Sequence, residues 1–201
     1  MEYVIRGLII GLIIGIPLEQ AAEMLVQNAT RKGVKSCIWT GVGTALAYLI
    51  LASIDVLLVS FFSKYIIKTE PYLGYAVGGL IIIFGMFSLI RNENNYDTDN
   101  SDSNNFMNAM NGFMLGFTNK YALVLIFYLY IFFDIGRINF KDGIRLAVST
   151  AVGAFAWCII IGVISWIVGR ITEIKKIRIY LVFSNLFVMS AGVFIILYKL
   201  M

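Results

Sequence analysis

Apolar residues along this chain fall in long blocks separated by short polar segments. Most blocks run for about 20 residues, the length of α-helix that crosses a hydrocarbon layer of about 30 Å. Apolar residues make up 60% of the sequence, so the chain has no room for a soluble domain beside these blocks. The blocks cover residues 4–27, 37–59, 72–90, 107–133, 145–168 and 179–199. The pattern predicts an all-α, polytopic protein with six transmembrane helices, located in the plasma membrane as a multi-pass integral protein.

Two of the connecting segments differ in character. The segment Lys64–Tyr72 is predicted to be a turn, with Pro71 in the first turn of the next helix, where its missing amide needs no partner. Residues 91–105, RNENNYDTDNSDSNN, are almost entirely polar and acidic, so they cannot bury enough apolar surface to order themselves. We interpret them as a flexible linker between a first three-helix unit, residues 1–90, and a second, residues 106–201.

The second half of the chain repeats the first. Arg31–Ala45 aligns without gaps on Lys141–Phe155, and Gly78–Phe87 aligns on Asn185–Phe194. The matched positions include Gly11 with Gly112, Gly15 with Gly116, Thr40 with Thr150, Gly43 with Gly153 and Gly85 with Gly192. A unit of three spans is odd in number, so the second copy must enter the membrane from the opposite side. The repeat therefore predicts two inverted-topology three-helix units, an arrangement that permits alternating access to a central site.

Each half also begins with an apolar helix that is interrupted before its end. In the first half, Pro17 and two carboxylates, Glu19 and Glu23, follow the apolar run. Unpaired backbone groups cost several kcal/mol each in lipid, so a break at this depth requires protein or a watery cavity around it. The alignment of the two halves places Lys120 opposite Glu19. Two matching helices thus present opposite charges at matching positions.

We predict that the substrate site forms where these two interruptions meet. A charged side chain inside a membrane costs roughly 2.5 to 3.5 kcal/mol, so the charged residues that a protein keeps there form ion pairs, line water-filled cavities or take part in its function. Glu19 and Lys120 would bind the ammonium and the carboxylate of a zwitterionic solute, and Glu19 or Glu23 would carry a coupling proton. A static ion pair that locks the two halves together is the structural alternative. The predicted substrate-binding residues are Pro17, Glu19, Glu23, Thr118, Asn119 and Lys120, of which Thr118 and Asn119 can hydrogen-bond the freed backbone.

Charge and rare residue types narrow the chemistry further. The net charge of +4 would suggest nucleic acid for a soluble protein, but the basic residues here lie at helix ends. They indicate topology signals and contact with anionic lipid headgroups, and we expect no nucleic-acid partner. His is absent, and Cys37 and Cys158 show no C-x-x-C spacing, so the sequence predicts no metal site, cofactor or redox motif. No catalytic residues stand out, and we expect a protein that is not an enzyme.

The order and spacing of these motifs resemble those of the lysine-exporter-type (LysE/RhtB) amino-acid translocators. Pro17-Leu18-Glu19 resembles that family's P-G-P, and the stretch EPYLGYAVGGLIIIFG is similar to its third helix. Gly112-Phe113 through Asn119-Lys120-Tyr121-Ala122 resembles its G-F-x-x-x-x-x-N-P-K-A. In both motifs a family proline is replaced, by Glu19 and by Lys120. The resemblance implies export of amino acids or related small zwitterionic solutes, driven by the proton gradient.

Two other functions stay open on the residues alone. An inorganic cation exporter of the same superfamily would use Glu19, Glu23 and Asp55 as hard oxygen ligands, although a lysine at the same site argues against it. A membrane thiol carrier would shuttle electrons between Cys37 and Cys158, which are not symmetry mates in the repeat. We interpret Asp55, which lies close to a helix end, as a structural residue. The glycine-lined helix faces leave a homodimer open.

Overall fold

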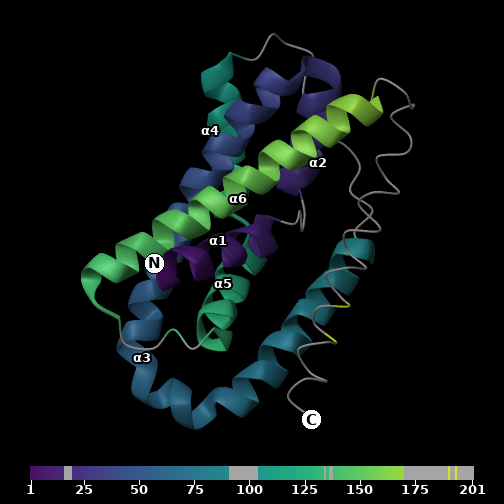
Figure 1. Cartoon of the computed structure of the whole chain (residues 1–201). Helices are drawn as coiled ribbons and strands as arrows, with labels where there is room; N and C mark the ends of the chain where they lie inside the picture. The colour runs from purple at the N-terminus through teal and green to yellow at the C-terminus, as the bar shows by residue number, and fades with distance from the viewer. Residues whose placement is uncertain are drawn as a thin grey trace.

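The computed structural model describes residues 1–15, 20–90, 104–133, 135, 138–169, 190 and 193, and this part of the chain is helical and contains no β-strand. Its helices are α1 (Glu2–Gly15), α2 (Gln20–Gln27), the π-helix η1 (Asn28–Lys32), α3 (Val34–Ile90), α4 (Asn105–Phe117), α5 (Lys120–Phe132) and α6 (Phe140–Gly169). Figure 1 shows the long helix α6 crossing in front of α3, with α1 and α5 beside them. The predicted all-α class is confirmed for these residues.

Two of the described helices contain segments long and apolar enough to cross a membrane. These segments are Val34–Phe62 in α3 and Phe140–Ile167 in α6. The segments Asn105–Phe117 and Ala122–Phe132, bent by 63° relative to each other, would together form a third. These segments indicate a membrane protein. The count of six spans stays a prediction, because the blocks 4–27 and 179–199 fall partly outside the described residues.

The helix α3 corrects one expectation about the connections. It continues without a break from Val34 to Ile90, so the segment Lys64–Tyr72 is helical and not a turn between two helices. Pro71 is the main helix breaker in this segment, and a single proline removes one backbone hydrogen bond and bends a helix without ending it. Figure 1 shows the result, since α3 descends along α4, curves at its lower end and rises again on the right.

Close backbone contacts at glycines hold α1 on α6 and α4 on α3. In the first pair, Gly7 lies against Leu146 and Ser149, Gly11 against Thr150 and Gly153, and Gly15 against Trp157. In the second pair, Gly43 lies against Ala109 and Phe113, Gly112 against Thr40, and Gly116 against Thr44 and Ala47. Residue numbers rise together along both partners, so the helices of each pair run parallel. Small residues allow this close approach, which is typical of helix contacts in membranes.

The two sets of contacts correspond position by position in the repeat alignment. Gly11 aligns with Gly112, and their neighbours Thr150 and Thr40 align with each other. A pair of hydrogen bonds matches as well. The Thr40 hydroxyl donates to the Ser36 carbonyl at 3.0 Å, and the Thr150 hydroxyl donates to the carbonyl of the aligned residue at 2.9 Å. The same helix pairing therefore occurs twice, and each time it joins a helix of one half of the chain to a helix of the other half.

The helices α3 and α6, one from each half, run antiparallel to each other. Cys37 lies against Gly162, Gly41 against Cys158, and Val56 against Gly143, so residue numbers rise on one helix as they fall on the other. The helix α5 packs on the same part of α3 and completes the main core. The fully or almost fully buried residues of this core include Tyr48, Leu51, Ala52 and Val59 of α3, Ile126 and Tyr130 of α5, and Leu146 and Ala147 of α6.

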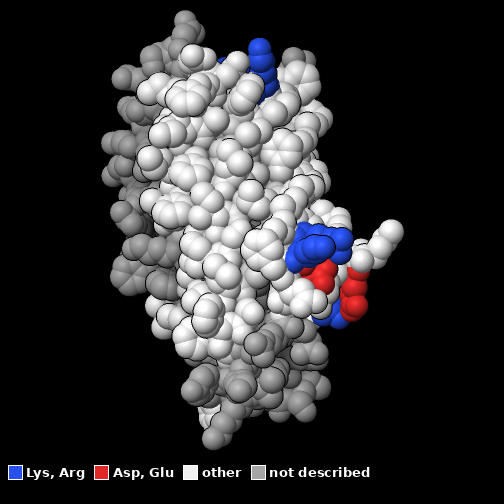
Figure 2. Space-filling view, turned by 90° about the vertical axis from the view of Figure 1, so that its left-hand side faces the viewer, with Lys and Arg blue, Asp and Glu red and all other residues white. Residues whose placement is uncertain are grey.

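The surface carries its charges at two levels, as a membrane protein requires. In Figure 2 one face is free of charge over most of its height, with basic residues at the top and basic and acidic residues together lower on the right. The exposed charged side chains of the described part are Arg31, Lys32 and Lys35 near the start of α3, and Glu2, Lys141 and Arg145 near the starts of α1 and α6. Since α3 and α6 are antiparallel, these groups mark opposite ends of the helices. Roughly 20 residues of α3 separate the two levels, or about 30 Å, the thickness of a bilayer's hydrocarbon core.

Candidate functional site

The structure describes only part of the predicted substrate site. Pro17 and Glu19 lie outside the described residues. The backbone of Glu23 belongs to α2 and that of Lys120 begins α5, but both side chains lie outside the described part as well. The predicted meeting of Glu19 with Lys120 at the centre of the protein therefore stays a prediction.

The break between α4 and α5 is described, and its side chains bond to the backbone. Thr118 caps the C-terminus of α4, and its hydroxyl donates to the Met114 carbonyl at 2.8 Å. Asn119 is buried, and its side-chain oxygen accepts a hydrogen bond from the Ala122 amide at 3.2 Å, in the first turn of α5. The Asn119 amide nitrogen donates to the Tyr48 hydroxyl at 3.4 Å. Asn119 thus holds the break in place through bonds to α3 and α5, whereas the exposed Thr118 bonds back to α4. The contact of either residue with a solute stays a prediction.

A second polar centre lies in the core, at Asp55 of α3. We interpret this residue from the sequence as structural, and a structural carboxylate is expected to have hydrogen-bond donors around it. Instead, Asp55 is 0% exposed, and neither of its carboxyl oxygens has a hydrogen-bond partner in the described part of the protein. An unpaired charge in this position would cost several kcal/mol. The carboxyl group therefore requires a proton or another cation as its partner.

Two hydroxyl groups on α5 and α6 are buried as well. Tyr130 of α5 is fully buried, and its hydroxyl shares a hydrogen bond of 3.2 Å with the Thr150 hydroxyl of α6, in which either hydroxyl can be the donor. Asp55 lies close enough to Tyr130 to interact with it electrostatically. A phenol oxygen has two lone pairs, so the Tyr130 oxygen can accept a further hydrogen bond in either arrangement.

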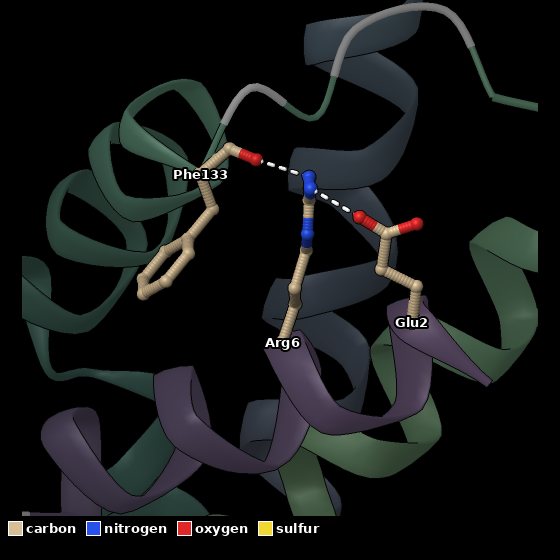
Figure 3. A network of polar contacts seen from close by, with 3 residues as sticks. All are labelled: Glu2, Arg6 and Phe133. Carbon is tan, nitrogen blue, oxygen red and sulfur yellow. Dashed lines mark hydrogen bonds and ion pairs between the residues drawn. The ribbon is translucent and has the colours of Figure 1, made fainter.

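Arg6 closes the end of α5 that lies beside this centre. As Figure 3 shows, its guanidinium donates to the Phe133 carbonyl after α5 and also to the Glu2 carboxylate one turn away on α1. The chain around Phe133 is tied further by a hydrogen bond of 2.8 Å from the Ile135 amide to the Tyr130 carbonyl. Arg6 thus links α1 to α5 at the level of the charged starts of α1 and α6.

The two cysteines meet between α3 and α6, although they occupy different positions of the repeat. Both are buried and free, and Cys37 Sγ lies 4.0 Å from the Cys158 carbonyl oxygen. They approach because the antiparallel crossing brings the start of α3 against the later part of α6. Their chain spacing gives no sign of this contact. In the described residues, no group of three or more His, Cys, Asp or Glu side chains gathers to hold a metal ion.

The sequence indicates a structural role for Asp55, with a ligand role only in the alternative cation exporter, and it indicates no functional role for Tyr130 or Thr150. Asp55 is the one charged residue between Lys35 and Lys64, and an isolated charge inside an apolar block is the signal that indicates a site. Tyr130 lies in an apolar run, where a buried hydroxyl calls for a partner. Thr150 entered the sequence analysis only as a repeat match.

Comparison of the chain with protein-family models, with characterised proteins and with solved structures gave no match. The resemblance to the lysine-exporter-type translocators is thus a hypothesis that these comparisons leave without support. The function is argued below from the geometry of the chain itself.

Proposed function

We propose that the protein is a secondary transporter that exports an amino acid or a related small zwitterionic solute by alternating access, coupled to protons. The observation that carries this proposal is the repeated helix pairing. The helix α1 runs parallel to α6, and α4 runs parallel to the first part of α3, whereas α3 and α6 are antiparallel. The same pairing therefore occurs twice in opposite directions, which is the relation that an inverted repeat of two three-helix units requires.

The described break after α4 supports the same proposal. The helix α4 ends at Phe117 and is capped by Thr118, which aligns with Pro17 in the repeat, where the sequence predicts the matching break of the first half. Broken helices of this kind present backbone amides and carbonyls inside the bilayer, where transporters use them to bind solutes. Two similar halves that exchange conformations would open such a site to one side of the membrane and then to the other.

The charges predicted at the two breaks define the class of solute. In this proposal the solute ammonium group binds Glu19 and Glu23 and its carboxylate binds Lys120. Asn119, Thr118 and the chain at Pro17 shape the ends of the helices around it. A zwitterion suits this pair of groups because it neutralises both charges at once, whereas an inorganic cation would leave Lys120 unpaired beside it.

The proposal is tested with purified protein in liposomes loaded with a mixture of labelled amino acids. We expect efflux of one or a few amino acids when the outside is made acidic or alkaline relative to the inside, and no efflux from empty liposomes. Replacing Lys120 with Gln should reduce efflux at least tenfold. The matched control Lys141→Gln, at an exposed lysine at the start of α6, should leave efflux within about twofold of wild type. Folded protein that releases none of the amino acids would contradict the proposal.

A membrane thiol carrier is the second candidate, since the structure brings Cys37 and Cys158 into contact. In such a carrier the two thiols would form a disulfide, giving two electrons and two protons to a partner disulfide. The burial of both thiols, which are 1% and 3% exposed, opposes exchange with a partner. If the transporter proposal is right, the double variant Cys37→Ser and Cys158→Ser should keep efflux within about threefold of wild type. Loss of all activity with a folded protein would favour the thiol carrier.

A further inference from the structure

We propose that Asp55 is a proton-binding site and that it carries the coupling proton of the transport cycle. The proposal deepens the transporter function above and rests on it for the coupling role. It assigns the proton to a residue of the described core, whereas the sequence predicts Glu19 or Glu23 for this task. The first argument is position, because Asp55 is fully buried among apolar side chains of α3, α5 and α6.

The charged and titratable groups that the structure describes around Asp55 do not supply a partner for it. From α5 the facing group is Tyr130, which is hydrogen-bonded to Thr150. At the start of α6, next to the contact between Val56 and Gly143, Arg145 forms an ion pair of 3.1 Å with Asp142. From α1, Arg6 is bonded to Glu2 and to the Phe133 carbonyl. Each of these described cations thus has another partner, and neither carboxyl oxygen of Asp55 is hydrogen-bonded within the described part.

The proton fits this site better than the other available cations. Hard metal ions take six or more oxygen ligands, and in the described residues no group of three or more His, Cys, Asp or Glu side chains gathers to hold a metal ion. The ammonium group of the proposed solute is also too far away. Asn119, at the break, stands 11 positions before Tyr130 in the chain, which is about 16 Å along a helix. A proton needs only one carboxyl oxygen and no further ligands.

The hydroxyl of Tyr130 is compatible with a protonated carboxyl group at Asp55. Tyr130 shares a hydrogen bond with Thr150, in which either hydroxyl can be the donor, and its second lone pair can accept a further hydrogen bond. In the cycle, hydronium on one side would give its proton to the Asp55 carboxylate and leave as water. The carboxyl group would return the proton to water on the other side.

Arg6 connects two of the helices through which water would have to reach the core. Its bonds to Glu2 and Phe133 tie α1 to the end of α5, three residues beyond Tyr130 (Figure 3). In this proposal, α1 and α5 would separate and admit water when these bonds open.

Infrared difference spectroscopy tests proton binding without any transport assay. We expect the purified wild-type protein to show the carbonyl band of a buried protonated carboxyl group, which shifts in heavy water. The band should be absent in Asp55→Asn and present in Asp142→Asn, the matched control at a half-buried carboxylate that is ion-paired. Tyr130→Phe should shift the band, since it removes the neighbouring hydroxyl. If Asp55→Asn shows the same band as wild type, the proposal is overturned.

Liposome assays then test the coupling role. Asn resembles the protonated carboxyl group, so Asp55→Asn should still exchange labelled for unlabelled solute across the membrane, while efflux driven by a proton gradient falls at least tenfold. An Asp55→Asn protein that keeps gradient-driven efflux overturns the coupling role. If wild-type protein moves no solute but loses its band on Asp55→Asn, the transporter proposal fails and proton binding stands. If Asp55→Asn does not fold, Asp55→Glu replaces it in the infrared experiment. We expect the carbonyl band of Asp55→Glu to differ in frequency from the wild-type band, and an unchanged frequency would overturn the proposal.

Discussion

The two parallel helix pairs, α1 with α6 and α4 with α3, share their backbone contacts but differ in the side chains that surround them. Gly11 and Gly112 each lie against the carbonyl of a matching threonine. One turn further along, Gly15 packs on the large ring of Trp157, whereas Gly116 packs on Thr44 and Ala47. The comparison teaches that the repeat preserves the approach of the backbones and leaves the neighbouring positions free to change.

The same comparison separates symmetric packing from asymmetric chemistry. In the repeat alignment Asp55 corresponds to Ser165 and Arg6 corresponds to Met107. The buried carboxyl group and the arginine that bonds to the end of α5 thus have no charged counterpart at the aligned positions. A transporter built in this way could exchange its two halves while its proton site responds to only one of the two conformations.

The largest expected effect is on the shared contacts. Gly11→Ala and Gly112→Ala each place a methyl group against a backbone carbonyl, of Thr150 and of Thr40 respectively, and should lower the free energy of unfolding by about 1 to 3 kcal/mol. Gly79→Ala is the control, because a methyl group there meets nothing within 4 Å, and it should stabilise its helix by up to about 1 kcal/mol. Thermal unfolding in detergent measures all three. A large effect at only one of Gly11 and Gly112 would show that the pairs are not equivalent.

The next largest effect on stability is expected at Asp55, the position that carries Ser165 in the second half. Asp55→Val removes a buried carboxyl group that has no hydrogen-bond partner in the described residues, so it should raise the free energy of unfolding by about 1 to 2 kcal/mol while it abolishes proton-driven efflux. The aligned change Ser165→Val should alter stability by less than about 0.5 kcal/mol. Chemical unfolding at neutral pH gives both values. A destabilised Asp55→Val protein would show that the carboxyl group is held by favourable contacts.

The described helix break can be probed through Asn119. Asn119→Ala removes the hydrogen bonds to the Ala122 amide and to Tyr48, and we expect a loss of about 1 to 2 kcal/mol, the usual value for a lost helix cap. Tyr48→Phe removes only the second bond and should cost about 1 kcal/mol or less. The exposed neighbour serves as control, and Thr118→Ala should change stability by less than about 0.5 kcal/mol. Equal losses for Asn119→Ala and Thr118→Ala would contradict this assignment.

The smallest effect is expected where α1 meets the end of α5. Arg6→Met gives the first half the residue that the second half carries at the aligned position, and it removes the bonds to Phe133 and Glu2. Because the arginine is partly exposed, the cost in stability should be only about 0.5 to 1 kcal/mol. Hydrogen exchange of the Ile135 amide should nevertheless accelerate, while Glu2→Gln, which keeps the bond to Phe133, should change it less. Unchanged exchange in Arg6→Met would rule out a closing role.

The sequence predicts the packing better than the connections. Glycine spacing marks positions of close helix contact such as Gly11, Gly43 and Gly112, although the sequence leaves open whether these faces meet within the chain or between subunits. The turn at Lys64–Tyr72 was predicted wrongly, since α3 continues through this segment and a single proline can bend a helix without ending it.

The site was less accessible to sequence reasoning. The break at Thr118 and Asn119 is visible as a polar interruption, and its bonds to the backbone follow from the residue types. The position of Asp55 against α5 depends on how three helices rotate about their axes, which no local pattern specifies. The contact between Cys37 and Cys158 arises in the same way, from the crossing of α3 with α6.

The unbroken course of α3 has a mechanical consequence. Its first part packs against α4, α5 and α6, while its later part rises on the other side of the bend (Figure 1). A continuous helix moves as one body, so a small tilt of the packed part would displace the distant end by a larger distance. A spin label near Tyr75, whose side chain is exposed, would then report the motion of the core from outside it.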